Sequence, residues 1–364
     1  MPRDTAQITF RIQAPIIASD KQAVYITGNH SALGNWQPDR FALHKVAEGR
    51  WELGVELPKG TNLEFKLTRG SWETEEVVKN GQVQGNRQLH VQEDQVLNVQ
   101  VNNWRDILFR SKKGIVGQVR YHRNVTSPLL KYKRDIIVWL PPGYDERPET
   151  RYPVLYMHDG QNLFDPATAF AGIDWGMDET ATRLIKKGKI QAIIIVGLTN
   201  TPARLDEYAD TTIGRNYMRF MVEEVKPLID KQYRTLPRRE HTAVMGSSMG
   251  GLVSLYLIFL FPEIFSKAGC LSSSLFWHDH AVFDFISSQE SVPNKVKIYI
   301  DHGGVGDEAK YAPDYRGLRD LLIEKGCRPG IDLAYCFDKR GDHSERSWAR
   351  RVKRPLRFLF GVGS

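Results

Sequence analysis

The sequence is poor in cysteine and contains no long hydrophobic segment. Its 364 residues include three cysteines, Cys270, Cys327 and Cys336, which lack the even number and close spacing of a disulfide framework or a zinc site. Cys270 and Cys336 stand in apolar segments, so we expect buried, reduced thiols. No apolar stretch approaches the ~18 residues that a membrane span requires, which predicts no membrane association.

Targeting signals and a strong charge of one sign are missing as well. The N-terminus, MPRDTAQITF, has no apolar core of a signal peptide, so we expect a cytoplasmic protein, or a secreted or periplasmic one if a signal had been removed. The 50 basic residues exceed the 43 acidic ones only slightly, giving a net charge of +7. The sequence contains neither a basic stripe nor a recognisable nucleic-acid-binding motif, so we expect no nucleic-acid partner.

The first hundred residues show apolar side chains at every second position. One such series is Ile8, Phe10 and Ile12, and others run through residues 51–57, 63–67 and 97–101. Segments rich in glycine and asparagine separate them. Alternation over several short segments predicts an N-terminal antiparallel β-sandwich domain at residues 1–105. A basic, weakly patterned stretch at 106–117 follows, which we interpret as a linker.

Residues 118–364 have a different pattern. Continuous apolar segments such as PVLYMHD, AIIIVGL and TAVMGSS alternate with helix-like segments such as MDETATRLIKKG and APDYRGLRDLLIEKG. Buried strands that alternate with helices predict an α/β domain with a mostly parallel sheet covered on both faces. In such domains functional residues gather at the carboxyl ends of the strands.

A candidate nucleophile stands in the segment HTAVMGSSMGG. Its Gly-x-Ser-x-Gly motif centres on Ser248, with a predicted strand before it and a predicted helix after it. This is the context of a nucleophile elbow, in which flanking glycines permit a tight turn that exposes the serine Oγ. The N–H of Met249 would then face a developing oxyanion at the helix N-terminus. A plain glycine-rich loop is the alternative interpretation.

A nucleophilic serine needs a general base and an acid that orients it, in the chain order Ser, acid, His. His343 lies in the polar segment KRGDHSERSW after the last strand, and we prefer it to His302, His278 and His280. The loop DHGGVGDE follows the preceding strand and contains three candidate acids, listed in our order of preference: Asp307, Glu308 and Asp301. Asp301 still belongs to the strand, so we place the acid at Asp307.

The second oxyanion donor should come from the loop after an early strand. The segment VLYMHDGQNLF provides such a loop, with the N–H of Gly160 or Gln161 as the donor. The whole set needs no metal or other cofactor to hydrolyse an ester.

Four ordered motifs, DIIVWLPPGYDE, YPVLYMHDGQNLFD, GSSMGG and GDHSERSW, resemble the esterase-D family of α/β-hydrolases over about residues 115–364. The resemblance implies ester hydrolysis by a triad on Ser248, with the acid loop and His343 at the family's positions. The acid loop departs from the family's usual Asp-x-Gly-Thr form. Three residues near the expected mouth of the site could bind substrate or simply pack: Trp175, Arg204 and Tyr208.

The N-terminal segments resemble the starch-binding module of glucoamylases over about residues 6–105. They share a Leu-Gly-x-Trp motif, a tryptophan that opens a strand, a lysine beside an aromatic residue, and Trp-Glu followed by Asn-Arg. The resemblance implies one sugar site at Trp36, Lys66, Trp72, Glu73 and Asn86. Trp51 would belong to a second site or to the core. Lys66 alternates with buried positions and is expected to face solvent.

Together these features predict a serine carboxylic ester hydrolase whose substrate is an acetyl or feruloyl ester linked to a carbohydrate. A siderophore esterase is the alternative enzyme, because such enzymes also carry an N-terminal β domain. An alternative of another class is a carbohydrate-binding scaffold with an inactive hydrolase domain. A purely structural role for the β-sandwich also stays open.

Overall fold

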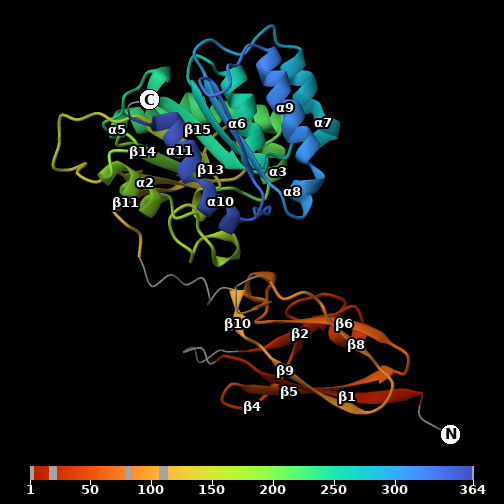
Figure 1. Cartoon of the computed structure of the whole chain (residues 1–364). Helices are drawn as coiled ribbons and strands as arrows, with labels where there is room; N and C mark the ends of the chain where they lie inside the picture. The colour runs from red at the N-terminus through yellow and green to blue at the C-terminus, as the bar shows by residue number, and fades with distance from the viewer. Residues whose placement is uncertain (1–3, 16–22, 79–82, 106–113, 363–364) are drawn as a thin grey trace. The chain divides into compact units, whose positions relative to one another are not determined.

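A computed structural model of the chain describes residues 4–15, 23–78, 83–105 and 114–362. The chain divides into two compact units (Figure 1). The first comprises Met1–Lys112 with Phe170–Ile173, and the second comprises Lys113–Ala169 with Asp174–Ser364. Of the expected linker at 106–117, residues 106–113 lie outside the described residues.

The first unit contains two four-stranded sheets and one two-stranded pair. One sheet has the order β4-β5-β1-β9, with β1 (Thr5–Gln13), β4 (His44–Ala47), β5 (Arg50–Pro58) and β9 (Gln95–Gln100). The other has the order β3-β2-β6-β8, with β2 (Tyr25–Gly28), β3 (Phe41–Ala42), β6 (Asn62–Thr68) and β8 (Arg87–His90). The small pair joins β7 (Glu76–Val77) and β10 (Asn103–Trp104). Neighbouring strands are antiparallel except β1 and β9, which pair in parallel.

The alternating apolar residues form the core of this unit, as the sequence predicted. Ile8, Phe10 and Ile12 of β1 are at most 2% exposed, and the series at 63–67 in β6 is equally buried. The rings of Phe10 and Phe65 come from different sheets and lie 5.1 Å apart. The two sheets therefore pack face to face as a β-sandwich.

The second unit is built on an eight-stranded sheet of order β11-β12-β14-β13-β15-β16-β17-β18. β12 is antiparallel to its two neighbours, and the remaining pairs are parallel. The strands are β11 (Gln118–Val125), β12 (Arg134–Leu140), β13 (Val154–His158), β14 (Ile194–Leu198), β15 (Thr242–Ser247), β16 (Lys267–Leu271), β17 (Lys297–Gly303) and β18 (Leu333–Asp338). The apolar segments predicted all the strands but β11, an edge strand whose side chains are largely exposed.

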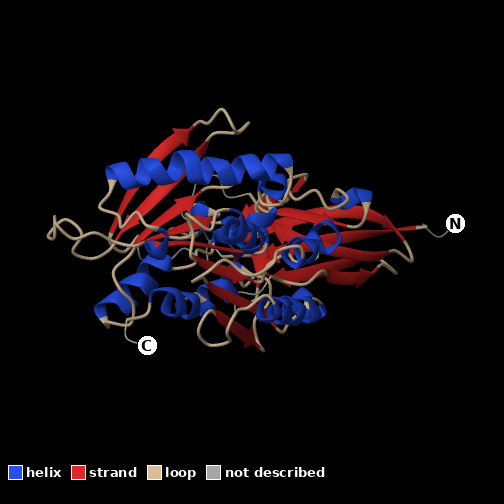
Figure 2. Cartoon of the chain, turned by 90° about the horizontal axis from the view of Figure 1, so that it is seen from above, coloured by secondary structure: helices blue, strands red, loops and turns tan. Residues whose placement is uncertain are grey.

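Helices cover both faces of this sheet (Figure 2). They are α2 (Met177–Lys186), α3 (Arg204–Glu207), α4 (Thr212–Arg219), α5 (Lys226–Gln232), α6 (Met249–Leu260), α7 (Trp277–Ser287), α8 (Asp307–Lys310), α9 (Ala312–Glu324), α10 (Glu345–Arg351) and α11 (Lys353–Phe360). A π-helical segment, Phe220–Val225, connects α4 and α5. Short 3-10 turns lie at Ser31–Leu33, Trp72–Thr74, Gly160–Asn162, Phe170–Gly172 and Arg239–His241.

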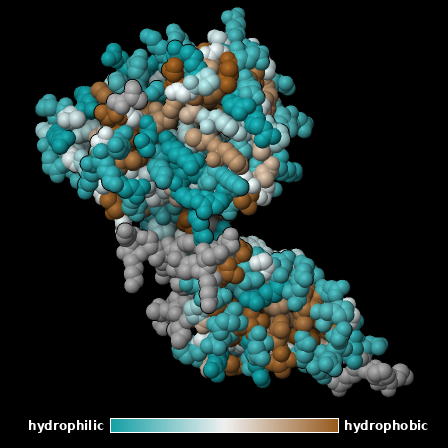
Figure 3. All heavy atoms as spheres, in the orientation of Figure 1, coloured by the Kyte–Doolittle hydropathy of each residue, from teal (hydrophilic) through white to brown (hydrophobic). Residues whose placement is uncertain are grey.

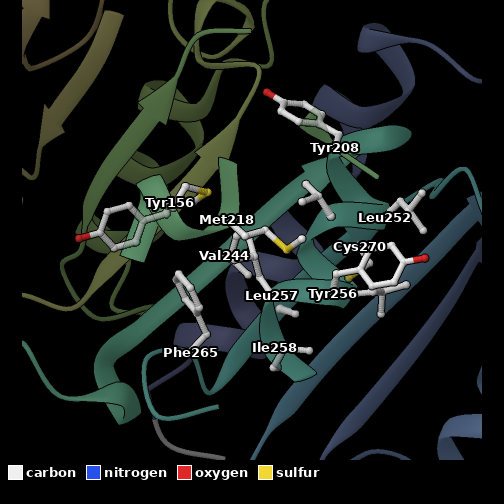
Figure 4. Packing of buried hydrophobic residues seen from close by; sticks show 14 of the residues in the cluster. Tyr156, Tyr208, Met218, Val244, Leu252, Tyr256, Leu257, Ile258, Phe265 and Cys270 are labelled. Atoms are coloured by element: carbon white, nitrogen blue, oxygen red, sulfur yellow. The ribbon is translucent and has the colours of Figure 1, made fainter. Parts of the chain in front are cut away.

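Successive residues of the central strands point into two separate cores. Tyr156 packs on one face, where its ring contacts Phe265 and Figure 4 shows it near Met218 and Val244, whereas Leu155 and Met157 pack on the other. Both faces of these strands are buried, which explains why the strands are apolar throughout, unlike those of the sandwich. On the face shown in Figure 3 both units are largely hydrophilic, with scattered apolar residues. None of the described helices has the length and apolar character to span a bilayer.

Candidate active site

Ser248 lies on a sharp turn between the end of β15 and the start of α6. Its backbone angles are φ 57° and ψ −124°, a conformation that a residue other than glycine adopts only under strain. A Cβ atom at Gly246 would lie 2.6 Å from the carbonyl carbon of Gly250, so glycine is required where strand and helix approach. The turn places Ser248 at the carboxyl end of a central parallel strand.

Met249 is the first residue of α6. The N–H groups in the first turn of an α-helix have no acceptor within the helix, so the Met249 N–H is open to an external acceptor beside Ser248. The Met249 side chain itself is buried in the core. The positive end of the helix dipole adds to the attraction for an anion at this point.

His343 lies in the loop between β18 and α10 and approaches Ser248 directly. Its Nε2 is 3.0 Å from the Ser248 Oγ, and its Nδ1 is 2.8 Å from the Oε1 of Glu308. An ionised carboxylate can only accept hydrogen bonds, so Nδ1–H donates to Glu308 and Nε2 is left to accept from Ser248. The three side chains form one continuous hydrogen-bonded chain.

The placement of the acid at Asp307 is corrected by this geometry. Asp307 and Glu308 are the first two residues of α8, and consecutive helical side chains point about 100° apart. Asp307 is exposed, whereas Glu308 is 1% exposed and faces His343. The Oε2 of Glu308 also accepts a hydrogen bond from the Gly303 N–H at 2.8 Å. Glu308, our second choice, is the carboxylate beside the histidine.

Glu308 is held in its ionised form. Burial alone would raise the pKa of its carboxyl group, but hydrogen bonds from His343, the Gly303 N–H and Ser272 outweigh burial and lower this pKa below its usual value. The carboxylate therefore keeps its negative charge beside the imidazole and favours one orientation of the ring.

A buried polar layer supports these residues. Asp301, the third acid considered, forms an ion pair with Arg351 in which both side chains are at most 1% exposed. Arg351 also donates to the Oγ of Ser272 at 2.6 Å, and the indole N–H of Trp348 donates to the same oxygen at 3.0 Å. The Trp348 ring packs edge-on against His343. None of these supporting contacts was predicted from the sequence.

A second serine stands next to Ser248. The Oγ of Ser274 is 3.1 Å from the Ser248 Oγ, and the Ser274 N–H donates to the Ser248 carbonyl at 3.1 Å. Sequence reasoning missed this residue. The signal was available, because the serine run at 272–274 directly follows β16 and must lie at the same edge of the sheet as Ser248.

The loop after β13 carries the two remaining oxyanion candidates, Gly160 and Gln161. A Cβ atom at Gly160 would lie 2.5 Å from the backbone of Gly197, so the loop requires glycine there. The Oε1 of Gln161 accepts from the N–H of Asn200 at 3.1 Å, which ties the loop to the end of β14. Asp159 precedes them in the left-handed conformation, with φ 57°.

Two of the three predicted pocket residues hold this loop in place. Arg204 donates two hydrogen bonds to the carboxylate of Asp159, at 2.7 and 2.8 Å, and the Tyr208 hydroxyl accepts from the Asp159 N–H at 3.2 Å. Tyr208 is fully buried, and Trp175 is 3% exposed and packs on Trp348. The core-packing alternative therefore applies to Tyr208 and Trp175, and only Arg204 keeps an exposed surface.

A buried histidine lies beneath the same loop. His158 packs against the rings of Tyr208 and Tyr217, which also contact each other, and its Nδ1 is 2.8 Å from the Tyr217 hydroxyl. Burial lowers the pKa of His158 to about 3; the charge of Asp159 opposes this shift, and the nearby arginines Arg204 and Arg134 reinforce it. The imidazole is therefore neutral at physiological pH.

In the first unit, strand register brings together the residues predicted to bind sugar. Lys66 of β6 pairs with Thr27, and the Trp36 N–H donates to the carbonyl of the next residue, Gly28. The Lys66 Nζ lies 6.0 Å from the centre of the Trp72 ring. Asn86 precedes Arg87, which pairs with Phe65, so Asn86 falls opposite Lys66. The Glu73 side chain is outside the described residues.

For this unit the structure decides one open alternative and corrects one expectation. Trp51 is 1% exposed and belongs to the core of the sandwich, so its indole face is not available for stacking on a sugar. Lys66 does not extend freely into solvent, because its ammonium group forms an ion pair with Glu75 at 2.8 Å and its side chain is only 15% exposed. Trp36 and Trp72 are half-buried, and Asn86 is exposed.

Comparison with known proteins assigns families to both parts of the chain. Residues 127–357 match the family described as "Putative esterase", and residues 5–101 match the starch binding domain family. A protein of Xylanibacter ruminicola named endo-1,4-beta-xylanase/feruloyl esterase is 29% identical over 160 residues, which are 38% of this chain and 19% of that protein.

Solved structures show the same fold. A ferulic acid esterase structure has a TM-score of 0.55 at 21% identity and covers 67% of this chain and 98% of its own. The enterobactin esterase of Shigella flexneri, determined in the presence of enterobactin, has a TM-score of 0.58 at 14% identity and covers 99% of this chain and 94% of its own. Since the esterase match alone spans more than half of the chain, the protein belongs to this esterase family and is a carboxylic ester hydrolase with an N-terminal starch-binding domain.

Proposed function

We propose that the protein hydrolyses esters linked to carbohydrates through a triad of Ser248, His343 and Glu308. One observation carries the triad: the His343 ring is within hydrogen-bond distance of Ser248 Oγ through one nitrogen and of Glu308 through the other. This arrangement of nucleophile, base and orienting acid is the one that activates a serine hydroxyl in unrelated folds.

In the first half of the reaction, Ser248 Oγ attacks the ester carbonyl as its proton passes to His343 Nε2. The resulting oxyanion accepts hydrogen bonds from the N–H of Met249 and from that of Gly160 or Gln161. The tetrahedral intermediate then expels the alcohol, which takes the proton from His343, and leaves an acyl group on Ser248. Glu308 stabilises the imidazolium while it carries that proton.

In the second half, water attacks the acyl carbonyl and gives a proton to His343. The second tetrahedral intermediate releases the carboxylic acid, and the proton returns to Ser248 Oγ. The Ser274 hydroxyl, 3.1 Å from Ser248 Oγ, can accept or donate a hydrogen bond there and limits the rotation of the nucleophile.

The starch-binding domain supports a carbohydrate-linked substrate. Support comes from the neighbourhood of Lys66: Asn86 falls opposite it, the centre of the Trp72 ring lies 6.0 Å from its ammonium group, and the Trp36 N–H bonds to Gly28 on the adjacent strand. Indole faces there can stack on sugar rings, and polar groups can bind hydroxyls. The relative from Xylanibacter ruminicola combines a feruloyl esterase with a xylanase by name. We therefore propose acetyl or feruloyl groups on a polysaccharide as the esters cleaved.

A siderophore esterase is the second candidate. The observation that favours it is coverage: the enterobactin esterase structure matches 99% of this chain, including the N-terminal unit, whereas the ferulic acid esterase structure matches 67%. An inactive scaffold is disfavoured, because the Ser–His–Glu hydrogen bonds are complete.

The test is an activity screen of the full chain on four substrates: p-nitrophenyl acetate, methyl ferulate, acetylated xylan and a ferric catecholate ester. We expect turnover of the small ester and of methyl ferulate or acetylated xylan. A preference for the catecholate ester would select the siderophore candidate. No turnover of any ester would select the scaffold.

A further inference from the structure

Three carboxyl groups gather just before and at the start of α2, in the segment GIDWGMDE. One carboxylate oxygen from each of Asp174, Asp178 and Glu179 lies within 4.8 Å of the others. Calcium binds oxygen ligands at 2.3–2.6 Å, so two of its ligands stand at most about 5 Å apart. The three oxygens are therefore spaced so that they can all reach one calcium ion.

The hydrogen bonds of the cluster leave acceptors unused. Asp178 is fully buried, and its Oδ2 accepts from the Val116 N–H at 2.6 Å, while an oxygen of Asp174 accepts from the Gly176 N–H at 3.0 Å. Among the described residues, no hydrogen-bond donor reaches the buried Asp178 Oδ1 or the buried Glu179 Oε2. A buried carboxylate oxygen without a partner is costly, which indicates that a ligand belongs there.

The charges around the cluster have the same sign. The N-terminus of α2 offers only about half a positive charge. The carboxylates therefore need a bound cation or bound protons to neutralise them.

We propose that Asp174, Asp178 and Glu179 bind a calcium ion. The ligands are hard oxygens without nitrogen or sulfur, which suits calcium, and its flexible coordination allows water molecules to complete the shell. None of the three carboxylates belongs to the hydrogen bonds that join Ser248, His343 and Glu308.

The calcium ion would stabilise the support of the active site. Asp174 directly precedes Trp175, whose ring packs on Trp348, and Trp348 packs on His343. Joining Asp174 to the first turn of α2 fixes the backbone on both sides of Trp175. The main expected effect is on thermal stability of the second unit, with a smaller effect on kcat.

The experiment uses the full chain after treatment with EGTA. Calcium at a hundredfold excess over its Kd should raise the Tm by roughly 5–10 °C. Terbium, a cation that also prefers oxygen ligands, should show emission sensitised by Trp175, and calcium should displace it. Trp175→Phe should remove this emission but keep the calcium-dependent rise in Tm.

Asp178→Asn and Glu179→Gln should each weaken calcium binding at least about tenfold, measured by calorimetry. Glu324→Gln, an exposed change in α9, is the matched control and should bind calcium like the wild type. Protons compete for the same oxygens, so affinity should be lower at pH 5.5 than at pH 7.5. If the wild type shows neither calcium binding nor a change in Tm, shared protons neutralise the cluster and the proposal is overturned.

Discussion

The two units differ in how exposed the polar groups beside their candidate sites are. In the esterase unit the residues around Ser248 are supported by buried polar side chains. Examples are Asp301, Arg351 and His158, each at most 2% exposed. In the sandwich unit the candidate sugar-binding residues Trp36 and Trp72 are partly exposed, and Lys66 pairs with the buried carboxylate of Glu75, which also pairs with Arg105. Buried polar support is therefore present at both sites, but its side chains are more exposed to solvent beside Lys66 than beneath Ser248.

This difference follows from what each site has to do. Catalysis requires reacting atoms held within a fraction of an ångström, which loosely packed side chains cannot provide. Stacking of an indole on a sugar face tolerates small shifts, so a half-exposed Trp36 or Trp72 is sufficient. Changes in the first site should therefore have large effects on kcat, and changes in the second should have moderate effects on binding.

The largest effect is expected for Ser248→Ala. The nucleophile is lost while the core is unchanged, so kcat on p-nitrophenyl acetate should fall by about 10⁴–10⁶-fold. Retention on amylose should stay at the wild-type value. Ser247→Ala, one residue earlier in β15, is the control and should have a mild effect. Substantial turnover by the Ser248 variant would remove this residue from the mechanism.

The next effect separates the two acids of α8. Glu308→Gln should lower kcat by about 10³–10⁴-fold. The neutral amide lacks the negative charge that orients the His343 ring and stabilises its protonated form. Asp307→Asn, on the exposed neighbour, should change kcat less than about twofold. Equal losses in both variants would mean that the acid does not act through its contact with His343.

The third prediction concerns acid stability and His158. The pKa of this residue is about 3 in the folded chain and 6.5 ordinarily, so below pH 6.5 the unfolded chain binds a proton that the folded chain does not. Its contribution to stability is complete above pH 6.5 and decreases as the pH falls toward 3. At pH 4 the loss should be roughly 3 kcal/mol.

Thermal unfolding of the esterase unit between pH 7 and pH 4 measures this loss. His158→Gln should unfold at a lower temperature at pH 7 and show a shallower dependence on pH. His44→Gln, at an exposed position of the sandwich, should keep the wild-type pH dependence. The same slope in all three proteins would show that His158 is not the group responsible.

The smallest effect is expected at the sugar site. Trp36→Ala and Trp72→Ala should each weaken binding to amylose or β-cyclodextrin by about 1–3 kcal/mol, the range known for stacking of aromatic side chains on nucleic-acid bases. Affinity electrophoresis measures the change, and the double variant should show no retardation. Hydrolysis of p-nitrophenyl acetate should be unaffected. A wild type that binds no glucan or xylan would make the sandwich a structural domain and favour the siderophore ester.

Much of this molecule could be predicted because the signals were local. The period of two in β1 and β6 and the continuous apolar strands of the second unit each follow from which faces are buried. The Ser248 turn was visible in its flanking glycines, strand and helix. His343 was predicted as a member of the site because it follows the last strand, where carboxyl ends meet.

The remaining features depend on contacts between residues far apart in the chain. Whether Asp307 or Glu308 faces His343 depends on the direction of a side chain in α8, which neither residue's neighbours reveal. The sequence could not show that Tyr208 and Arg204 hold Asp159, or that Trp51 lies inside the sandwich. Local periodicity shows which residues are buried, so the sequence by itself determined the two folds and indicated Ser248 as the candidate nucleophile. Only tertiary packing decided the acid and the supporting layer, because a hydrogen bond across the fold leaves no periodic trace in the sequence.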